Sequence, residues 1–221
     1  MKGLTRVIAI GNKAGRIVDY LRQENDYDNA EFWFCGTKVS NILRHGYLAE
    51  PHILFSKKFN TKYIEAIHVD NEMVAIVIAS LDETISRIYL YDVVGEVWNY
   101  ADKVYCFLTL PTDKDGVESR NRAIDLFHKI TDRSDITVLH DCKDIPEGVL
   151  FEDGMAQLVK CCLEYPDADN EEVHELMTTA EWATVKQMWA ILNSYVVNKM
   201  PAYLEAATFS FHKRGKEDCW Y

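Results

Sequence analysis

The stretch Met73-Val74-Ala75-Ile76-Val77-Ile78-Ala79 is apolar at every position and rich in β-branched side chains. A strand that faces water on one side alternates apolar and polar residues, whereas a strand covered on both faces has no such constraint. The run therefore predicts a strand of a parallel sheet that has helices packed on both faces.

Strands and helices are expected to alternate on both sides of this run. Further short strands are predicted at Thr5–Ile10, Glu31–Cys35, His52–Phe55, Lys103–Leu110 and Ile136–Leu139. Helical spacing of apolar residues is found at Arg16–Gln23, Leu81–Trp98 and Gly116–Ile130. Such alternation indicates βαβ units, so we predict an α/β fold, a Rossmann-like doubly wound parallel sheet.

The pattern becomes mostly helical after about Pro146. Helices are predicted at Gly154–Glu164, Asn170–Met177 and Ala180–Val197, and a lone strand at Ala206–His212. We therefore divide the chain into an α/β domain, residues 1–147, and a helical C-terminal extension, residues 148–221. The helix at Ala180–Val197 has a broad apolar face, which either packs on the sheet or docks on another subunit or partner.

Composition excludes several classes of protein. The formal net charge of −11 argues against a nucleic-acid partner, because phosphate contacts need clustered Lys and Arg. No apolar run resembles a signal peptide or is long enough for a transmembrane segment. None of the six cysteines forms a CxxC pair, and several lie in apolar strands or helices. We expect a cytoplasmic protein with reduced thiols and no structural metal.

Open parallel sheets bind ligands at the carboxyl ends of their strands, so the loops there are the candidate sites. Of these loops, Gly11–Gly15 is the most suggestive, since glycine lets the backbone approach a phosphate at a helix N-terminus. Its spacing matches neither GxGxxG nor a P-loop, and a tight turn explains it as well. His140 beside Asp141 is interpreted as a solvated loop histidine rather than an acid–base catalyst.

Taken in the order in which they follow along the chain, the predicted strands and their loops resemble the nucleotide-binding domain of the FtsZ/tubulin GTPases. Val7–Val18 is similar to the first strand and glycine-rich loop of that family, of which only Gly11 and Gly15 remain. Glu31–Cys35 with Gly36-Thr37 corresponds to the "FIAxNTD" strand and loop. The family signature GGGTGTG falls on Leu81–Arg87, where Thr84 alone matches.

The later units carry the resemblance further, to about residue 178. Phe107–Pro111, with Asp115 and Arg120, is similar to "VVTKPFxFEGxxR". Asp169 and Glu172 lie in a stretch that resembles the NxDxxD loop, although an acidic turn before a helix explains it equally well. The resemblance implies nucleotide-binding roles for Gly11, Gly15, Thr84, Asp115 and Arg120, and catalytic roles for Asp169 and Glu172.

Departures from the family pattern bear on two possible functions. The signature glycines are missing, and Asp82 and Glu83 place negative charge where a phosphate would lie. Our leading hypothesis is a degenerate FtsZ/tubulin-like protein that self-associates or binds a partner without hydrolysing GTP and needs no cofactor. The alternative is a GTP- or GDP-binding protein or GTPase whose phosphate loop is rebuilt around Lys13, Arg87 and Arg120. A Rossmann dehydrogenase is disfavoured because the fingerprint is absent.

Overall fold

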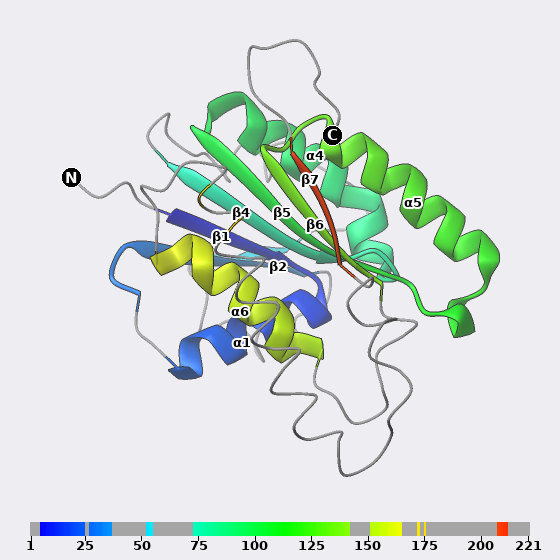
Figure 1. Ribbon diagram of the computed structural model, residues 1–221, viewed down its shortest axis with the longest axis horizontal. Helices are drawn as coiled ribbons and strands as arrows, with labels where there is room; N and C mark the ends of the chain where they lie inside the picture. The colour runs from blue at the N-terminus through cyan, green and yellow to red at the C-terminus, as the bar shows by residue number, and fades with distance from the viewer. Residues whose placement is uncertain are drawn as a thin grey trace.

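A seven-stranded sheet forms the centre of the computed structural model, which describes residues 5–24, 27–36, 52–54, 73–141, 151–164, 172, 175 and 207–211 (Figure 1). The strands are β1 (Thr5–Ile10), β2 (Ala30–Gly36), β3 (His52–Leu54), β4 (Val74–Ser80), β5 (Lys103–Leu110), β6 (Ile136–Asp141) and β7 (Ala207–Phe211). Their order is β3-β2-β1-β4-β5-β6-β7. The strands β1 to β6 run parallel, and the order reverses between β1 and β4.

Strand β4 lies between β1 and β5, as its composition predicts. All of its residues are buried, and Val77 pairs with Ile8 on one side and with Cys106 on the other. A strand in this position has no solvent-facing side, which is why its sequence shows no alternation.

Helices cover both faces of the sheet, so the predicted doubly wound α/β fold is confirmed (Figure 1). Helices α1 (Asn12–Glu24) and α6 (Phe151–Glu164) pack on one face, where Ile76 and Ile78 of β4 join their core. Helices α4 (Thr84–Tyr100) and α5 (Val117–Thr131) pack on the other, against Ala75 and Val77. None of the helices in the described ranges is long and apolar enough to cross a membrane.

Two described elements lie beyond residue 147, and both belong to the same sheet layers. Helix α6 contributes Met155 and Val159 to the core beneath α1. Strand β7 pairs antiparallel with β6, so the strand expected to be alone is an edge strand of the sheet. The division at residue 147 stays a prediction. Ala180–Val197 lies outside the described residues, as does Asn170–Met177 apart from helical Glu172 and Glu175.

The predicted five-residue turn Gly11–Gly15 is wrong, because α1 begins at Asn12 directly after β1. Gly11 has φ +89°, a conformation that glycine adopts without steric cost, and it reverses the chain in one residue. Gly15 is already helical, since its N–H donates to the Gly11 carbonyl at 3.0 Å. Gly11 alone therefore forms the turn between β1 and α1.

Candidate functional site

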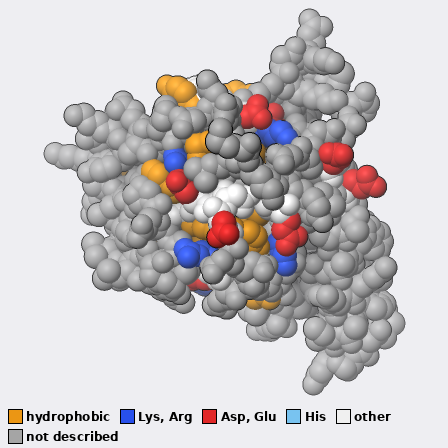
Figure 2. All heavy atoms as spheres, turned by 90° about the vertical axis from the view of Figure 1, so that its left-hand side faces the viewer, with side chains coloured by type: hydrophobic (Ala, Val, Ile, Leu, Met, Phe, Trp, Pro, Cys, Tyr) orange, Lys and Arg blue, Asp and Glu red, His pale blue; other side chains and the backbone are white. Residues whose placement is uncertain are grey.

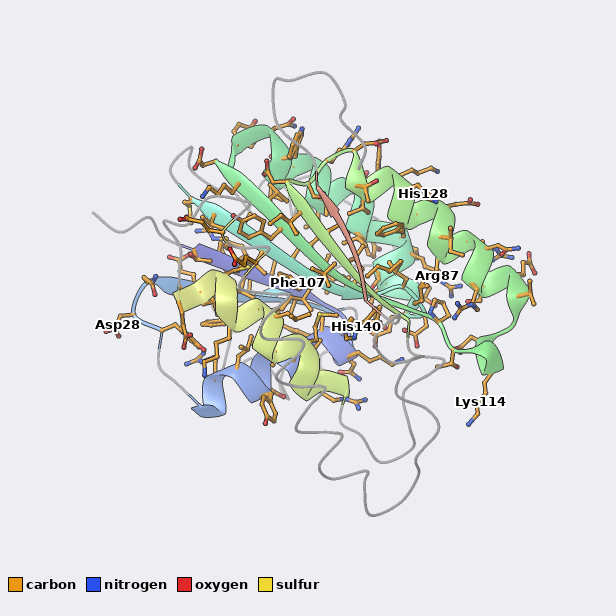
Figure 3. The ribbon with its side chains drawn as sticks, in the orientation of Figure 1. Asp28, Arg87, Phe107, Lys114, His128 and His140 are labelled. Carbon is orange, nitrogen blue, oxygen red and sulfur yellow. The ribbon has the colours of Figure 1, made fainter. Side chains whose placement is uncertain are left out.

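Three helices begin where the neighbouring strands β1, β4 and β5 end. Gly11 joins β1 to α1, Leu81–Glu83 joins β4 to α4, and Pro111–Gly116 joins β5 to α5. This edge lies beside the point where the strand order reverses, which is where open α/β sheets bind ligands. Figure 3 shows Arg87 and His140 at this end of the sheet.

The opposite, amino-terminal end of the sheet has a different character. Figure 2 looks at that end, where acidic and basic side chains of the described residues are interspersed. Arg6 and Glu31, each the second residue of its strand, form an ion pair at 2.6 Å, and the Arg6 guanidinium lies 4.5 Å from the centre of the Trp33 ring. Mixed charge on a packed surface is typical of an ordinary protein exterior.

The carboxylate of Glu83 lies against the start of α1. Its Oε1 accepts a hydrogen bond from the Asn12 N–H at 3.1 Å, across 71 residues of sequence. A Cβ added to Gly11 would lie 1.9 Å from Glu83 Oε2 and 3.1 Å from Ile85 Cγ2. Gly11 is thus required both by its backbone conformation and by the close approach of this carboxylate.

Asp82 is held by a second set of contacts. Its Oδ2 lies 2.5 Å from Lys13 Nζ, and its Oδ1 accepts a hydrogen bond from the Ser80 hydroxyl. The Ser80 and Thr109 hydroxyls are 2.5 Å apart, and both residues are buried at the ends of β4 and β5. Lys13, Asp82, Ser80 and Thr109 therefore form one connected polar chain from α1 to β5.

The residues aligned with the family's nucleotide contacts are anchored to their own loops. Thr84 opens α4 and is exposed, and Arg87 Nη2 donates to its hydroxyl at 3.3 Å. Asp115 Oδ2 accepts from the Thr112 N–H and hydroxyl, both at 2.8 Å, in the short turn η2 (Asp113–Asp115). Arg120 Nη1 donates to the Pro111 carbonyl at 2.7 Å.

Electrostatics at the edge are dominated by three acids and the cations near them. Burial raises the pKa of Glu83, and the charge of Asp82 adds to the rise, while the Asn12 and Lys13 backbone N–H groups oppose it. The Thr112 hydroxyl is the main cause that lowers the pKa of Asp115, with a contribution from the positive charges of Lys13 and Arg87. Within the described part of the chain, no three His, Cys, Asp or Glu side chains could hold a metal ion.

The structure brings together part of the predicted site. Gly11, Thr84 and Asp115 come from three loops at the same edge, and Arg120 lies one turn into α5. Gly15 lies inside α1. Their roles in nucleotide binding stay predictions.

The structure describes only one of the two predicted catalytic acids. Asp169 lies outside the described residues, and Glu172 is an exposed helical residue. Their catalytic roles also stay predictions. His140 is not a solvated loop residue as interpreted from the sequence, since it lies in β6 in register with Thr109 and is 2% exposed. The parallel pairing extends β6 past Leu139 and so carries His140 into the sheet.

Sequence reasoning missed the buried hydroxyls and the contact between the two loops. Ser80 and Thr109 are single polar residues at the ends of otherwise apolar strands, and that signal was available. The acidity of Asp82 and Glu83 was visible too. Both acids reach α1, Asp82 through the Lys13 ammonium group and Glu83 through the Asn12 N–H, and no sequence pattern reports these contacts.

The comparison with solved structures agrees with this fold. No protein-family model and no curated protein sequence matches the chain. Among solved structures, an FtsZ dimer from M. jannaschii matches with TM-score 0.64 and 15% identity, over 76% of this chain and 57% of FtsZ. CetZ2 from Haloferax volcanii matches with TM-score 0.57 and 15% identity, over 78% and 62%. TubZ of Clostridium botulinum phage c-st matches with TM-score 0.55 and 14% identity, over 77% and 64%.

At these identities the likeness concerns the fold. The chain spans less than two thirds of the length of each of these three proteins. The chain therefore has the Rossmann-like core fold of the FtsZ/tubulin proteins.

Proposed function

We propose that this chain is a degenerate FtsZ/tubulin-like protein that acts by self-association or by binding a protein partner, without hydrolysing GTP. The observation that carries the proposal is the pair of carboxylates between β4 and α4. Asp82 and Glu83 occupy the loop that corresponds to the glycine signature, and Glu83 lies against the N-terminus of α1.

Charge and space both oppose a nucleotide phosphate at this place. A phosphate at the start of α1 would meet the Glu83 carboxylate, which already accepts the Asn12 N–H. Two like charges about 4 Å apart repel by on the order of 4 kcal/mol at an effective dielectric of about 20. Lys13, the nearest cation on α1, is paired with Asp82. The edge is therefore poorly suited to a highly charged ligand in its present arrangement.

The similar structures support association as the mode of action. The FtsZ structure is a dimer, and the CetZ2 structure is a GTPγS-bound protofilament. Association through surfaces of this fold does not itself need a phosphate loop. The net charge of −11 favours a protein partner over a nucleic acid. A cytoplasmic location stays a prediction.

Calorimetric titration of GTP and GDP, with and without magnesium, tests the nucleotide half of the proposal. We expect no binding up to millimolar nucleotide and no release of phosphate from GTP. Turnover that is abolished in the Asp169→Ala/Glu172→Ala double variant would refute the proposal and support the family's catalytic loop. Sedimentation velocity over a wide concentration range tests self-association in the same preparation.

The alternative is a GTP-binding protein or GTPase with a rebuilt phosphate loop. One observation favours it: the Thr112 hydroxyl is the main cause that lowers the pKa of Asp115, and the positive charges of Lys13 and Arg87 add to it, so both cations lie near this edge. In that case the protein would bind nucleotide, and the Arg120→Ala substitution would weaken that binding. Arg122→Ala is the matched control, because Arg122 lies two residues further along α5 and is exposed beside Glu118. An equal loss of nucleotide affinity in both variants would indicate a nonspecific effect of removing a positive charge.

A further inference from the structure

Strand β7 forms one edge of the sheet. Its residues pair antiparallel with residues 136–140 of β6, and no other described strand pairs with it (Figure 1). In an antiparallel pair, the N–H and C=O groups of alternate residues point away from the partner strand. The strand β7 therefore has backbone donors and acceptors that β6 does not use.

The two edges of the sheet differ in how they are protected. At the opposite edge, β3 has only three residues, and very short edge strands resist pairing with another chain. Strand β7 has five residues and contains no charged residue and no proline, which are the residues that commonly block such pairing. Of the two edges, the one formed by β7 is thus better suited to accept a further strand.

The residues that flank β7 in the sequence carry opposite charges. Glu205 lies two positions before the strand, and Lys213 lies two positions after it, followed by Arg214. In an antiparallel pair, the residues that precede one strand lie beside the residues that follow the other. A second copy of this chain, paired through its own β7, would therefore bring an acid beside a base at both ends. Charge complementarity thus favours a second copy as the partner.

Two-fold symmetry restricts the register of such a pair. Residues directly opposite each other share a face of the sheet, whereas neighbours along a strand lie on opposite faces. A two-fold axis between two copies of one strand must therefore pass through a residue that lies opposite its own copy. Phe209, the middle residue of β7, is the choice that pairs all five residues of the strand. In that same register, Glu205 of each copy lies opposite Lys213 of the other.

We propose that two copies of this chain associate through β7, in an antiparallel two-fold pair centred on Phe209. The inference rests on the proposed function, because it takes self-association as the mode of action and specifies its surface. Two copies with a net charge of −11 repel each other in general. Contact at an uncharged strand that Lys213 and Arg214 follow is therefore favoured over contact at an acidic surface.

Charge reversal tests the register, with the dissociation constant of the dimer measured by sedimentation velocity on the full chain. Glu205→Lys and Lys213→Glu each place like charges opposite each other at both ends of the pair. Each should weaken the dimer by about tenfold or more, because two cross-strand pairs change at once. The double variant Glu205→Lys/Lys213→Glu exchanges the charges and should restore the dissociation constant of the unmodified protein.

The sign of one effect separates the β7 pair from a general influence of net charge. Glu205→Lys makes the chain less negative, so nonspecific repulsion between copies would fall and the dimer would strengthen. Pairing through β7 predicts a weaker dimer instead. Glu118→Lys is the matched control, because it changes the net charge by the same amount at an exposed position in the first turn of α5. It should not weaken the dimer.

A single cysteine tests the position of the two-fold axis. Directly opposite residues of an antiparallel pair have Cα atoms about 4.5–5.5 Å apart, which suits a disulfide. Diagonal neighbours are about 7–8 Å apart, which is too far. Under mild oxidation, Phe209→Cys should therefore join two copies through position 209, and Ser210→Cys should not join them through position 210. Peptide mass spectrometry identifies the linked positions.

Three results would overturn the inference. The first is a chain that stays monomeric at the highest concentration reached. The second is a charge-exchanged double variant whose dimer is as weak as those of the single variants. The third is a disulfide that forms through position 210 as readily as through position 209. None of these results touches the absence of GTP hydrolysis or binding to a protein partner, so the proposed function is tested separately by nucleotide titration.

Discussion

Replacement of Gly11 by alanine tests the contact on which the site depends. The new Cβ would lie 1.9 Å from Glu83 Oε2, a distance at which atoms cannot coexist. Either the carboxylate leaves the Asn12 N–H or the start of α1 shifts. We expect Gly11→Ala to be folded and clearly less stable than the unmodified protein.

Two costs add up to the expected magnitude. A non-glycine residue at φ +89° costs about 1–3 kcal/mol. Loss of the hydrogen bond between Glu83 and the Asn12 N–H, in a partly exposed setting, adds about 1–2 kcal/mol. The free energy of unfolding should therefore fall by about 2–5 kcal/mol, of which only the second part involves Glu83.

Urea denaturation of a double-mutant cycle separates the two costs. In the Glu83→Ser background, Gly11→Ala should cost about 1–2 kcal/mol less than in the unmodified protein, because the collision is gone. Gly116→Ala is a backbone control, since Gly116 has φ +84° and nothing lies within 4 Å of its added Cβ. Its cost should not change when Glu83 is replaced.

The reasoning would be refuted by additive effects of Gly11→Ala and Glu83→Ser. Additivity would mean that Glu83 does not lie against Gly11 in solution. A Gly11→Ala protein as stable as the unmodified one would refute both parts of the argument together.

Three further predictions concern buried groups. Asp135→Ala should lower the free energy of unfolding by about 1–3 kcal/mol in urea titrations, because the buried Val104 N–H, now 2.6 Å from Asp135 Oδ2, loses its acceptor; Asp135→Asn should cost less. Glu83→Gln should raise the free energy of unfolding in urea titrations at neutral pH, because the raised pKa of Glu83 means that its ionised form is the destabilised one. The gain should vanish below the ordinary glutamate pKa of about 4.3, where the glutamate is protonated in the folded and the unfolded protein. Cys35 and Cys106, whose pKa values are raised by burial, should resist iodoacetamide until the chain unfolds, as peptide mass spectrometry can show.

Most of the fold could be predicted from local patterns. The strands Thr5–Ile10 and Lys103–Leu110 have the predicted bounds, and β4 is displaced by only one residue from the apolar run. These patterns are local because a strand buried on both faces needs apolar side chains throughout. The error at Gly11–Gly15 arose because one glycine with positive φ can make a turn for which sequence reasoning expected five residues.

Less of the candidate site could be predicted. The order of the units located the edge, and Asp82 and Glu83 stood out as acids in a loop expected to hold glycine. The contacts of those acids were not predictable. Glu83 meets a residue 71 positions away, and the partner of Asp82 on α1 is 69 positions away. Such contacts depend on the register of β1 beside β4, which a single sequence does not report.

By itself, the sequence determined the α/β class, the alternation of elements and the edge of the sheet to examine, because burial on two faces and helical spacing are properties of neighbouring residues. Only the tertiary structure decided that Glu83 lies against Gly11 and that Asp82 pairs with Lys13. It also decided that α6 packs on one face of the sheet and that β7 adds an edge strand to it. Each of these contacts joins segments that are distant in the sequence. It can form only once the strands have paired and brought those segments together.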